Sequence, residues 1–276
     1  MTSEQVNSTR TVSRELRALQ ATCVAAAARG AEIVRAGAER RAQLTWESKS
    51  AGDFVSEVDR ASEEAIGEIV RARHPDAALL AEEMSSTVSA TSGLVFVADP
   101  LDGTTNFLHG FPWYAVSIAA MLDGELVAGA VINAANGELF AATKNGGARR
   151  NGQPIAVSTI DEPIRSLIAT GFPFKQGGPY DEYLRMLPAV MRATAGVRRP
   201  GAAALDLADV ACGRFEAFWE LTLSPWDIAA GVLLVREAGG VVTDVRGEPV
   251  RVAHTSIIAG NPAMHAWLLT TLAARG

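Results

Sequence analysis

The sequence predicts a fold of mixed helices and strands, antiparallel in its first half and alternating between α and β in its second half. Three observations support this prediction. Apolar residues recur at three- and four-residue steps near the start of the chain, short apolar runs separated by turn residues follow to about residue 143, and strand and helix patterns alternate from about residue 160. With 48% hydrophobic residues among 276, the chain can bury a large core.

Two helices and five strands are expected in the first half. Helical periodicity covers residues 11–37 and, after a polar interval, residues 59–73, where His74-Pro75 ends the second helix. The dipeptides Asp123-Gly124 and Asn136-Gly137 separate consecutive apolar runs, as the turns of β-hairpins do. The strands are expected at residues 78–81, 94–98, 114–121, 126–133 and 138–143.

Strands and helices alternate in the second half, which indicates an α/β arrangement. The turn at 145–154 and the Gly/Pro-rich loop at 171–179 are the natural places to divide the chain. We therefore expect an N-terminal half, 1–155, and a C-terminal half, 156–276, with a site in the cleft between them. The expected strands are 165–170, 215–220, 241–245 and 256–259, and the expected helices are 180–194, 203–213, 226–238 and 262–274.

The composition argues against several classes of function. A net charge of -6 and a pI near 5.3 disfavour a nucleic-acid-binding surface, which would need clustered Lys and Arg. No uncharged apolar stretch reaches the roughly 18 to 20 residues of a membrane helix, and the start of the chain lacks the pattern of a signal peptide. Two cysteines, Cys23 and Cys212, are too few for a disulfide framework. We expect a cytoplasmic protein with no nucleic-acid or membrane partner.

Two aspartates stand at the end of an apolar run, in the stretch Asp-Pro-Leu-Asp-Gly-Thr-Thr-Asn-Phe that begins at Asp99. Pro100 disfavours the α region for Asp99, so the chain stays extended there. Gly103 then permits a sharp turn into a helix that begins at Thr104. The carboxylates of Asp99 and Asp102 can therefore converge on one point, and the N–H groups of Gly103 and Thr104 would attract phosphate.

Other acids occupy similar positions. Glu82-Glu83 ends the apolar run 77–81, Asp227 begins an apolar helix, and Asp53 and Asp59 bracket a short run. A buried ionised carboxylate is costly unless it pairs, changes its pKa or binds a metal ion. Each acid alone could cap a helix or end a strand, but coincidence at four separate places is improbable. Because no Cys or paired His lies nearby in the sequence, these oxygen ligands suit Mg²⁺.

These motifs resemble those of the inositol monophosphatase family, which are Mg²⁺-dependent, lithium-sensitive phosphatases. The likeness extends from about residue 15 to residue 272, and the order and separation of the segments match the family. The resemblance implies a layered αβαβα sandwich that forms a homodimer. The segments that carry it are Asp53-Phe-Val-Ser-Glu-Val-Asp59, Ala81-Glu-Glu83, Asp99-Pro-Leu-Asp-Gly-Thr-Thr-Asn-Phe107, Trp226-Asp-Ile-Ala-Ala-Gly231 and Glu237-Ala-Gly-Gly240.

The resemblance also implies a site for two to three Mg²⁺ ions. Asp99 would bridge the first and second ions, and a looser third ion would lie near Glu82. Lys49 would correspond to a lysine of the family's mobile metal loop, although its spacing differs by one residue from the family pattern. The residues that match the family's metal ligands are Glu82, Asp99, the carbonyl of Leu101, Asp102 and Asp227.

In a site of this kind, Asp59 and the hydroxyl of Thr104 would orient and deprotonate the attacking water, with Glu83 in a supporting role. No phosphoenzyme is needed. The substrate would be a small phosphate ester, with inositol 1-phosphate as the first candidate, and Glu220 would accept hydrogen bonds from its hydroxyls. The positions that match the family's substrate-binding residues are Asp102, Gly103, Thr104, Gly201, Ala202, Ala203 and Glu220.

Several positions depart from the family pattern. Ala202 stands where relatives usually carry Ser or Thr, which removes one hydroxyl from the substrate loop. Ser56 replaces Thr, Phe96 stands where Trp is common, and Ala81 replaces Gly. None of these residues is a metal ligand, so the departures bear on substrate identity more than on hydrolysis.

Three alternatives stay open. A histidinol-phosphate phosphatase would share the fold and the metal ligands. A haloacid dehalogenase-like phosphatase has an Asp-x-Asp-Gly-Thr motif, whereas two residues separate Asp99 from Asp102 here. A non-catalytic partner in a transcription complex would not need to retain the full set of ligands.

Overall fold

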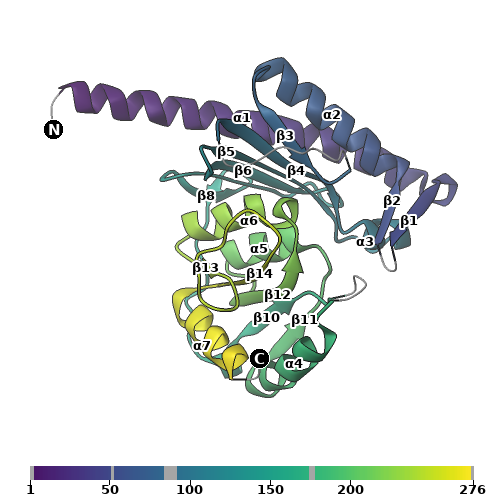
Figure 1. Ribbon diagram of the computed structural model, residues 1–276, viewed down its shortest axis with the longest axis vertical. Coiled ribbons are helices and arrows are strands. Elements are labelled where there is room, and N and C mark those ends of the chain that lie inside the picture. The colour runs from purple at the N-terminus through teal and green to yellow at the C-terminus, as the bar shows by residue number, and fades with distance from the viewer. Residues whose placement is uncertain (1–2, 51–52, 84–91, 174–177, 275–276) are drawn as a thin grey trace.

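The larger sheet of the computed structural model is covered on its outer face by two long helices, α1 (Ser3–Glu39) and α2 (Glu57–Arg73) (Figure 1). Among the described residues, which are 3–50, 53–83, 92–173 and 178–274, this sheet has seven strands. Neighbouring strands are antiparallel except β3 and β4, which are parallel. In spatial order the strands are β3 (Ala78–Ala81), β4 (Leu94–Asp102), β5 (Ala115–Leu122), β6 (Glu125–Asn133), β7 (Leu139–Thr143), β8 (Gly147–Arg150) and β9 (Gln153–Pro154).

The smaller sheet has five strands within the described ranges, in the order β11-β10-β12-β14-β13. Strand β10 is parallel to β11 and β12, and β14 is antiparallel to β12 and β13. The strands are β10 (Leu167–Thr170), β11 (Gly196–Arg198), β12 (Ala217–Leu223), β13 (Val241–Thr243) and β14 (Thr255–Gly260).

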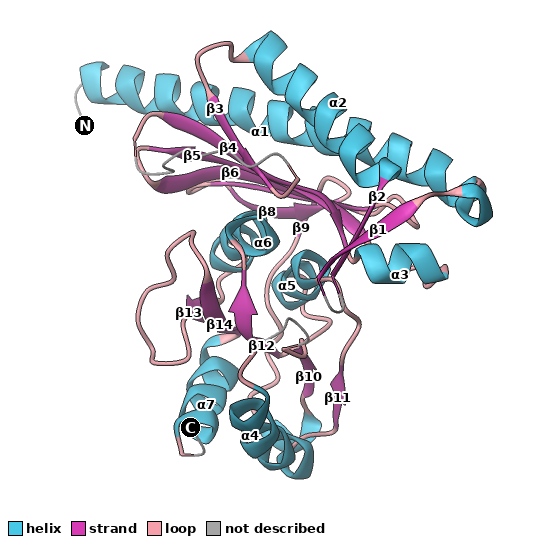
Figure 2. Cartoon of the chain, turned by 45° about the vertical axis from the view of Figure 1, so that its right-hand side comes forward, coloured by secondary structure: helices cyan, strands magenta, loops and turns pink. Residues whose placement is uncertain are grey.

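Four helices complete the layers. Helices α5 (Ala203–Ala211) and α6 (Pro225–Glu237) lie between the two sheets, and α4 (Tyr180–Ala193) and α7 (Pro262–Ala273) cover the outer face of the smaller sheet (Figure 2). The order of layers is therefore helix, sheet, helix, sheet, helix. This confirms the αβαβα sandwich that the resemblance implied.

The two central helices consist mainly of apolar residues because both faces of each helix are covered. Every residue of α5 is buried, and so is most of α6. The two helices approach each other closely at Gly231 of α6, where an added Cβ would lie 2.5 Å from Cδ1 of Leu207 on α5. Close packing of this kind fixes the position of both helix starts relative to the sheets.

The predicted helices and strands are present, and most ends differ by at most about four residues, but α1 begins at Ser3, eight residues before the predicted start at residue 11. The structure adds strands that the sequence did not predict: β1 (Trp46–Ser50), β2 (Asp53–Ser56), β8, β9 and β11. All five are short, and β1 and β9 consist mainly of polar residues, so none has the apolar alternation that signals a strand. Two short 3₁₀ helices, η1 (Arg41–Gln43) and η2 (Pro163–Arg165), were also not predicted. No helix in the described ranges is both long and apolar enough to cross a membrane.

Glu237, at the last position of α6, joins this helix to the larger sheet. Its Oε1 accepts a hydrogen bond from the backbone N–H of Asn145 at 2.8 Å, and its Oε2 accepts one from Gly147 at 2.9 Å. Asn145 lies in the turn between β7 and β8, and Gly147 is the first residue of β8. The acid of the motif Glu237-Ala-Gly-Gly240 therefore has a structural role, because it connects a central helix to the sheet above it.

We predict that Glu237→Ala lowers the free energy of unfolding by about 2 kcal/mol, since two backbone donors lose a charged acceptor. Urea unfolding measures the change. Glu237→Gln is the matched control: it keeps one acceptor oxygen and should lose about half as much. Equal stability of the two variants would contradict this role for the carboxylate.

Candidate active site

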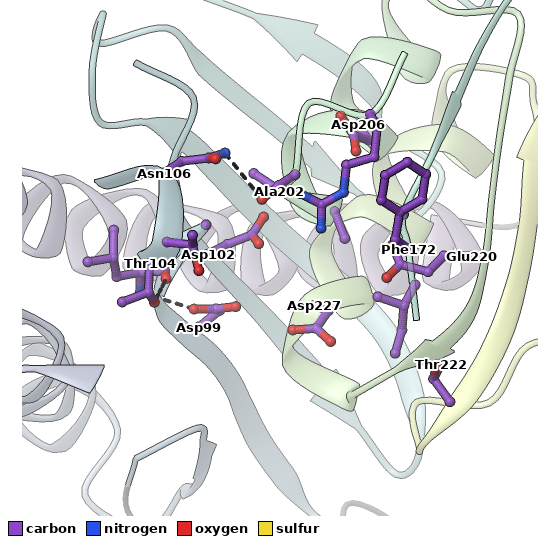
Figure 3. Close-up of a pocket in the computed structure, with 18 of the residues that line it drawn as sticks. Asp99, Asp102, Thr104, Asn106, Phe172, Ala202, Asp206, Glu220, Thr222 and Asp227 are labelled. Atoms are coloured by element: carbon purple, nitrogen blue, oxygen red, sulfur yellow. Dashed lines mark hydrogen bonds between the residues drawn. The ribbon is translucent and has the colours of Figure 1, made fainter. Parts of the chain in front are cut away.

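A cavity of about 380 Å³ lies where the larger sheet, α5, α6 and the smaller sheet meet (Figure 3). Its walls combine acids from one side with glycines, an aromatic ring and a guanidinium from the other. The lining residues that matter below are Glu82, Asp99, Leu101, Asp102, Gly103, Thr104, Asn106, Gly171, Phe172, Arg199, Gly201, Ala202, Ala203, Asp206, Glu220 and Asp227. The predicted metal ligands and substrate positions therefore all line one cavity.

A β-bulge brings Asp99 and Asp102 to the same place. The pairing of β4 with β5 shifts register between Asp99 and Asp102, so the two residues between them do not continue the ladder. The Oδ1 of Asp99 accepts the backbone N–H of Leu101 at 3.0 Å. Gly103 follows with φ +85°, a left-handed conformation that glycine adopts readily, and α3 (Thr104–His109) begins after it. The predicted turn and helix start are confirmed.

Asp59 is held at the start of α2 by a capping box. The backbone N–H and the hydroxyl of Ser56 donate to its Oδ2 at 2.9 Å and 2.6 Å. Its Oδ1 accepts the hydroxyl of Thr104 at 3.0 Å, and the same hydroxyl lies 3.0 Å from the carbonyl oxygen of Leu101. Because Thr104 has a single hydroxyl proton, it donates to one of these oxygens at a time. The predicted pairing of Asp59 with Thr104 is present in the structure.

Asp227 and Asp102 are also held by the starts of helices. Asp227 lies in the first turn of α6, and its Oδ2 accepts the backbone N–H of Ser224 at 2.6 Å. The Oδ2 of Asp102 accepts the N–H of Ala204, in the first turn of α5, at 2.8 Å. Backbone donors and the positive end of each helix stabilise a carboxylate at these positions.

Glu82 and Glu83 follow β3, and Lys49 of β1 lies against both. The ammonium of Lys49 is 3.0 Å from Oε1 of Glu82 and also forms a short ion pair with Oε1 of Glu83. The backbone N–H of Glu83 donates to Glu63 at 2.8 Å. The expected link between Lys49 and the acid cluster is therefore present, whereas the side chain of Asp53 lies outside the described residues.

Burial and mutual repulsion raise the pKa values of these acids. Burial raises the pKa of Asp102 to about 8, helped by the charges of Asp227 and Glu82. Burial raises the pKa of Glu82 to about 7, although Lys49 opposes the shift. The pKa of Asp99 lies well above its usual range because it is buried and faces Glu82, Asp102 and Asp227. At neutral pH, added positive charge therefore stabilises the cluster, whether it comes from protons or from a bound cation.

The donor set fits a divalent cation in chemistry and charge. Hard carboxylate oxygens surround one end of the cavity, and the carbonyl of Leu101 lies among them. Within the described ranges, no three His, Cys, Asp or Glu side chains stand together as a closed ligand group. Holding an ion would therefore require side-chain rotations within the cluster.

The predicted substrate positions in the second half of the chain line the same cavity; they are Gly201, Ala202, Ala203 and Glu220. Gly201 has φ +94° and leads into α5, where Ala202 occupies the N-cap position and has no side-chain oxygen to cap the helix. Glu220 projects from β12 into the cavity. Asp59 and Glu83 do not line the cavity themselves. Asp59 bonds to Thr104, which does, and Glu83 is linked through Lys49 to Glu82, which also does.

Several lining residues were not predicted, and Asn106, Arg199 and Asp206 are the polar ones with the clearest contacts or burial. Asn106 donates its amide hydrogens to the carbonyls of Trp113 at 2.7 Å and Pro200 at 2.9 Å. Its amide nitrogen also lies 3.3 Å from the carbonyl oxygen of Gly201, so α3 is tied to the loop that precedes α5 (Figure 3). The guanidinium of Arg199 lies 5.3 Å from the ring centre of Phe172. Asp206 is fully buried in α5, and burial raises its pKa well above the usual range. An aspartate inside the apolar run of α5 was the one signal visible in the sequence.

Known proteins with similar sequences and structures were compared with this chain. The profile of the inositol monophosphatase family matches residues 15–275. A Nus factor SuhB from Pseudomonas aeruginosa is 44% identical over 251 residues, 89% of this chain and 93% of that protein. An inositol-1-monophosphatase from Synechocystis sp. is 40% identical over 88% of this chain and 86% of that protein.

Solved structures agree with the sequence comparison. The extragenic suppressor protein suhB from Bartonella henselae has a TM-score of 0.87 and 41% identity, covering 91% of this chain and 96% of that one. An inositol monophosphatase from Anabaena has a TM-score of 0.81 and 33% identity, covering 95% and 98%. Phosphatase activity is the function that these matches support, and the chain belongs to the inositol monophosphatase family.

Proposed function

We propose that this chain is a Mg²⁺-dependent phosphomonoesterase that hydrolyses a small polyol monophosphate, with inositol 1-phosphate as the first candidate. One observation carries the proposal: four acids with a shared need for positive charge, Glu82, Asp99, Asp102 and Asp227, face a cavity whose other wall carries Glu220, a hydroxyl acceptor. Family membership supports the reaction class. Lithium sensitivity, a homodimer and a cytoplasmic location stay predictions.

The ligands proposed for Mg²⁺ are Glu82, Asp99, Asp102, Asp227 and the carbonyl of Leu101. When bound, Mg²⁺ would polarise the phosphate, lower the pKa of bound water and stabilise the leaving oxygen. The chain's own contribution is to place a proton acceptor beside the water. A water that donates to the hydroxyl oxygen of Thr104 can pass its proton on to Asp59, whose Oδ1 lies 3.0 Å from that hydroxyl.

Asp102→Asn tests the metal assignment. We expect Mg²⁺-dependent phosphate release from inositol 1-phosphate to fall at least about 100-fold, because a ligand charge is lost from a site built around it. Asp123→Asn is the matched control, since Asp123 lies in an exposed turn with φ +50°, where Asn is well tolerated. An undiminished rate in Asp102→Asn would exclude Asp102 as a ligand.

The metal-free protein should become less stable as the pH rises from about 4 to about 8. In this window Asp102 and Glu82 ionise in the unfolded chain but keep protons in the folded one, because their folded pKa values are about 8 and about 7. The folded state binds more protons, so the free energy of unfolding decreases as the pH rises. Thermal unfolding with a chelator across this pH range measures the trend, and Mg²⁺ should reverse it at pH 8.

Asp102→Asn tests whether repulsion among the buried acids causes this loss of stability. At pH 8 without metal, we expect the variant to be more stable than the parent protein by on the order of 1–3 kcal/mol, because one buried like charge is removed. Asn keeps an oxygen that can accept the N–H of Ala204. The proposal of repelling buried acids would be contradicted if the stability of the metal-free parent protein did not change with pH, or if Asp102→Asn were less stable than the parent at pH 8.

The substrate itself is decided by a screen. Histidinol phosphate is the principal rival, because the carboxylate of Glu220 would suit its ammonium group as well as a sugar hydroxyl. Phosphate release from inositol 1-phosphate, histidinol phosphate and p-nitrophenyl phosphate, at fixed Mg²⁺ with and without Li⁺, ranks them. A preference for histidinol phosphate would overturn the polyol assignment while leaving the reaction class intact.

A second role is favoured by the relatives named Nus factor SuhB, which are 39–44% identical to this chain. A Nus-factor-like role would consist of binding a protein of a transcription complex, since the net charge of -6 disfavours direct contact with nucleic acid. Asp102→Asn distinguishes the two roles. Co-purification with RNA polymerase that survives this substitution would support an interaction role independent of catalysis.

A further inference from the structure

The cavity wall opposite the acid cluster is the carboxyl edge of three parallel strands. Arg199 follows β11, Gly171 follows β10, and Glu220 lies in β12. Thr170 pairs with Trp219 in the register of β10 and β12, so Gly171 and Glu220 are neighbours across the same edge. All three wall residues line the cavity. Ligands of α/β sheets bind at such carboxyl edges, and here this edge lines the cavity.

Gly171 provides the space in which the carboxylate of Glu220 lies. A Cβ added at Gly171 would overlap Cδ and both carboxylate oxygens of Glu220, which are its three nearest atoms. The carboxylate therefore lies directly over the α-carbon of Gly171. Figure 3 shows Glu220 beside Phe172 at this wall.

The backbone alone does not require glycine at this position. Gly171 is absent from the set of glycines with positive φ, so an L-residue can adopt its conformation. Glycine is needed here because a side chain would have no room: the three atoms nearest to an added Cβ all belong to the carboxylate of Glu220. This differs from Gly103 and Gly201, which have φ of +85° and +94°.

The backbone around Gly171 is held in place, so it has little freedom to retreat from a new side chain. The N–H of Gly171 points to the carbonyl of Trp219 at 3.4 Å. The next residue, Phe172, packs edge-on against Tyr183 at 5.5 Å and under the guanidinium of Arg199 at 5.3 Å. Tyr183 in turn stacks on Trp219 at 5.9 Å. A Cβ at residue 171 would therefore move the flexible side chain of Glu220.

We propose that Gly171 is a specificity-determining residue, whose missing side chain lets Glu220 hold its carboxylate in the cavity to accept substrate hydroxyls. This inference rests on the proposed function. It assigns no direct contact with phosphate or metal to Gly171. Larger residues at this position would turn the carboxylate away and reduce the preference for polyhydroxylated esters over esters without hydroxyls.

Gly171→Ala tests the inference. We expect the KM for inositol 1-phosphate to rise about tenfold, the equivalent of one charged hydrogen bond. The KM for p-nitrophenyl phosphate should rise far less, because its nitrophenyl group carries no hydroxyl for Glu220 to bind. The measured quantity is the ratio of the two KM values in parent and variant. Equal rises for both esters would overturn the proposal.

A double-mutant cycle with Glu220→Ala makes the test independent of other effects. Glu220→Ala removes the three atoms nearest to the added Cβ, so Gly171→Ala should change the KM ratio no further in that background. Additive effects would show that Gly171 acts without Glu220. Unfolding of Gly171→Ala in both backgrounds would also contradict the proposal, because the Cβ would then collide with something else.

The outcome separates this inference from the proposed function. If the parent protein hydrolyses neither ester with Mg²⁺, the proposed function fails and the inference fails with it. If it hydrolyses both, and the KM ratio of Gly171→Ala equals that of the parent, only the role of Gly171 is wrong.

Discussion

The rest of the structure depends on holding several carboxylates close together away from water. Such a cluster repels itself, and each member needs donors to offset its loss of hydration. Backbone N–H groups supply them: Ser56 for Asp59, Leu101 for Asp99, Ala204 for Asp102 and Ser224 for Asp227. Three of these four donors belong to the starts of helices α2, α5 and α6, where the helix dipole also favours negative charge.

This requirement explains the central layer of the sandwich. For α5 and α6 to present their first turns to the acids, both helices must lie between the sheets, surrounded by protein on every side. Their sequences are accordingly mainly apolar. The two helices pack closely at Gly231 of α6, where there is no room for a side chain beside Leu207 of α5. Glu237 anchors the far end of α6 to the larger sheet. The layered fold thus places the helix starts that hold the acid cluster.

Much of this could be predicted from the sequence, and the exceptions have physical reasons. Acids that end apolar runs were visible as a pattern, and the long periodic helices were found, although α1 begins eight residues before its predicted start because its first turns are polar. The convergence of Asp99 and Asp102 followed from Pro100 and Gly103, although the β-bulge that produces it depends on pairing with β5. Local sequence carries no information on such pairing.

The residues that were missed act through tertiary contacts. Asn106 matters because the carbonyls of Trp113 and Pro200 lie beside its amide, and those carbonyls come from distant segments. The strands β1 and β11 form on partners rather than on their own apolar pattern. Arg199 is placed by the end of β11, so its position could not be read before the strand itself was known.

Helix capping and ligand binding, which compete as explanations when each acid is taken alone, are compatible in the folded protein. A carboxylate has two oxygens, and capping occupies one: Oδ2 of Asp59 accepts from Ser56, while Oδ1 faces Thr104. The cap fixes the orientation of the group, and its hydrogen-bond donors favour the charged form. Lys49 already meets part of the cluster's demand for positive charge at Glu82 and Glu83. A divalent ion would meet the rest at Asp99 and Asp102, where the described residues show no ion pair with a basic side chain. The stability lost by crowding these acids would therefore be recovered on binding of the proposed ion, so that occupancy of the site and stability of the fold would be linked.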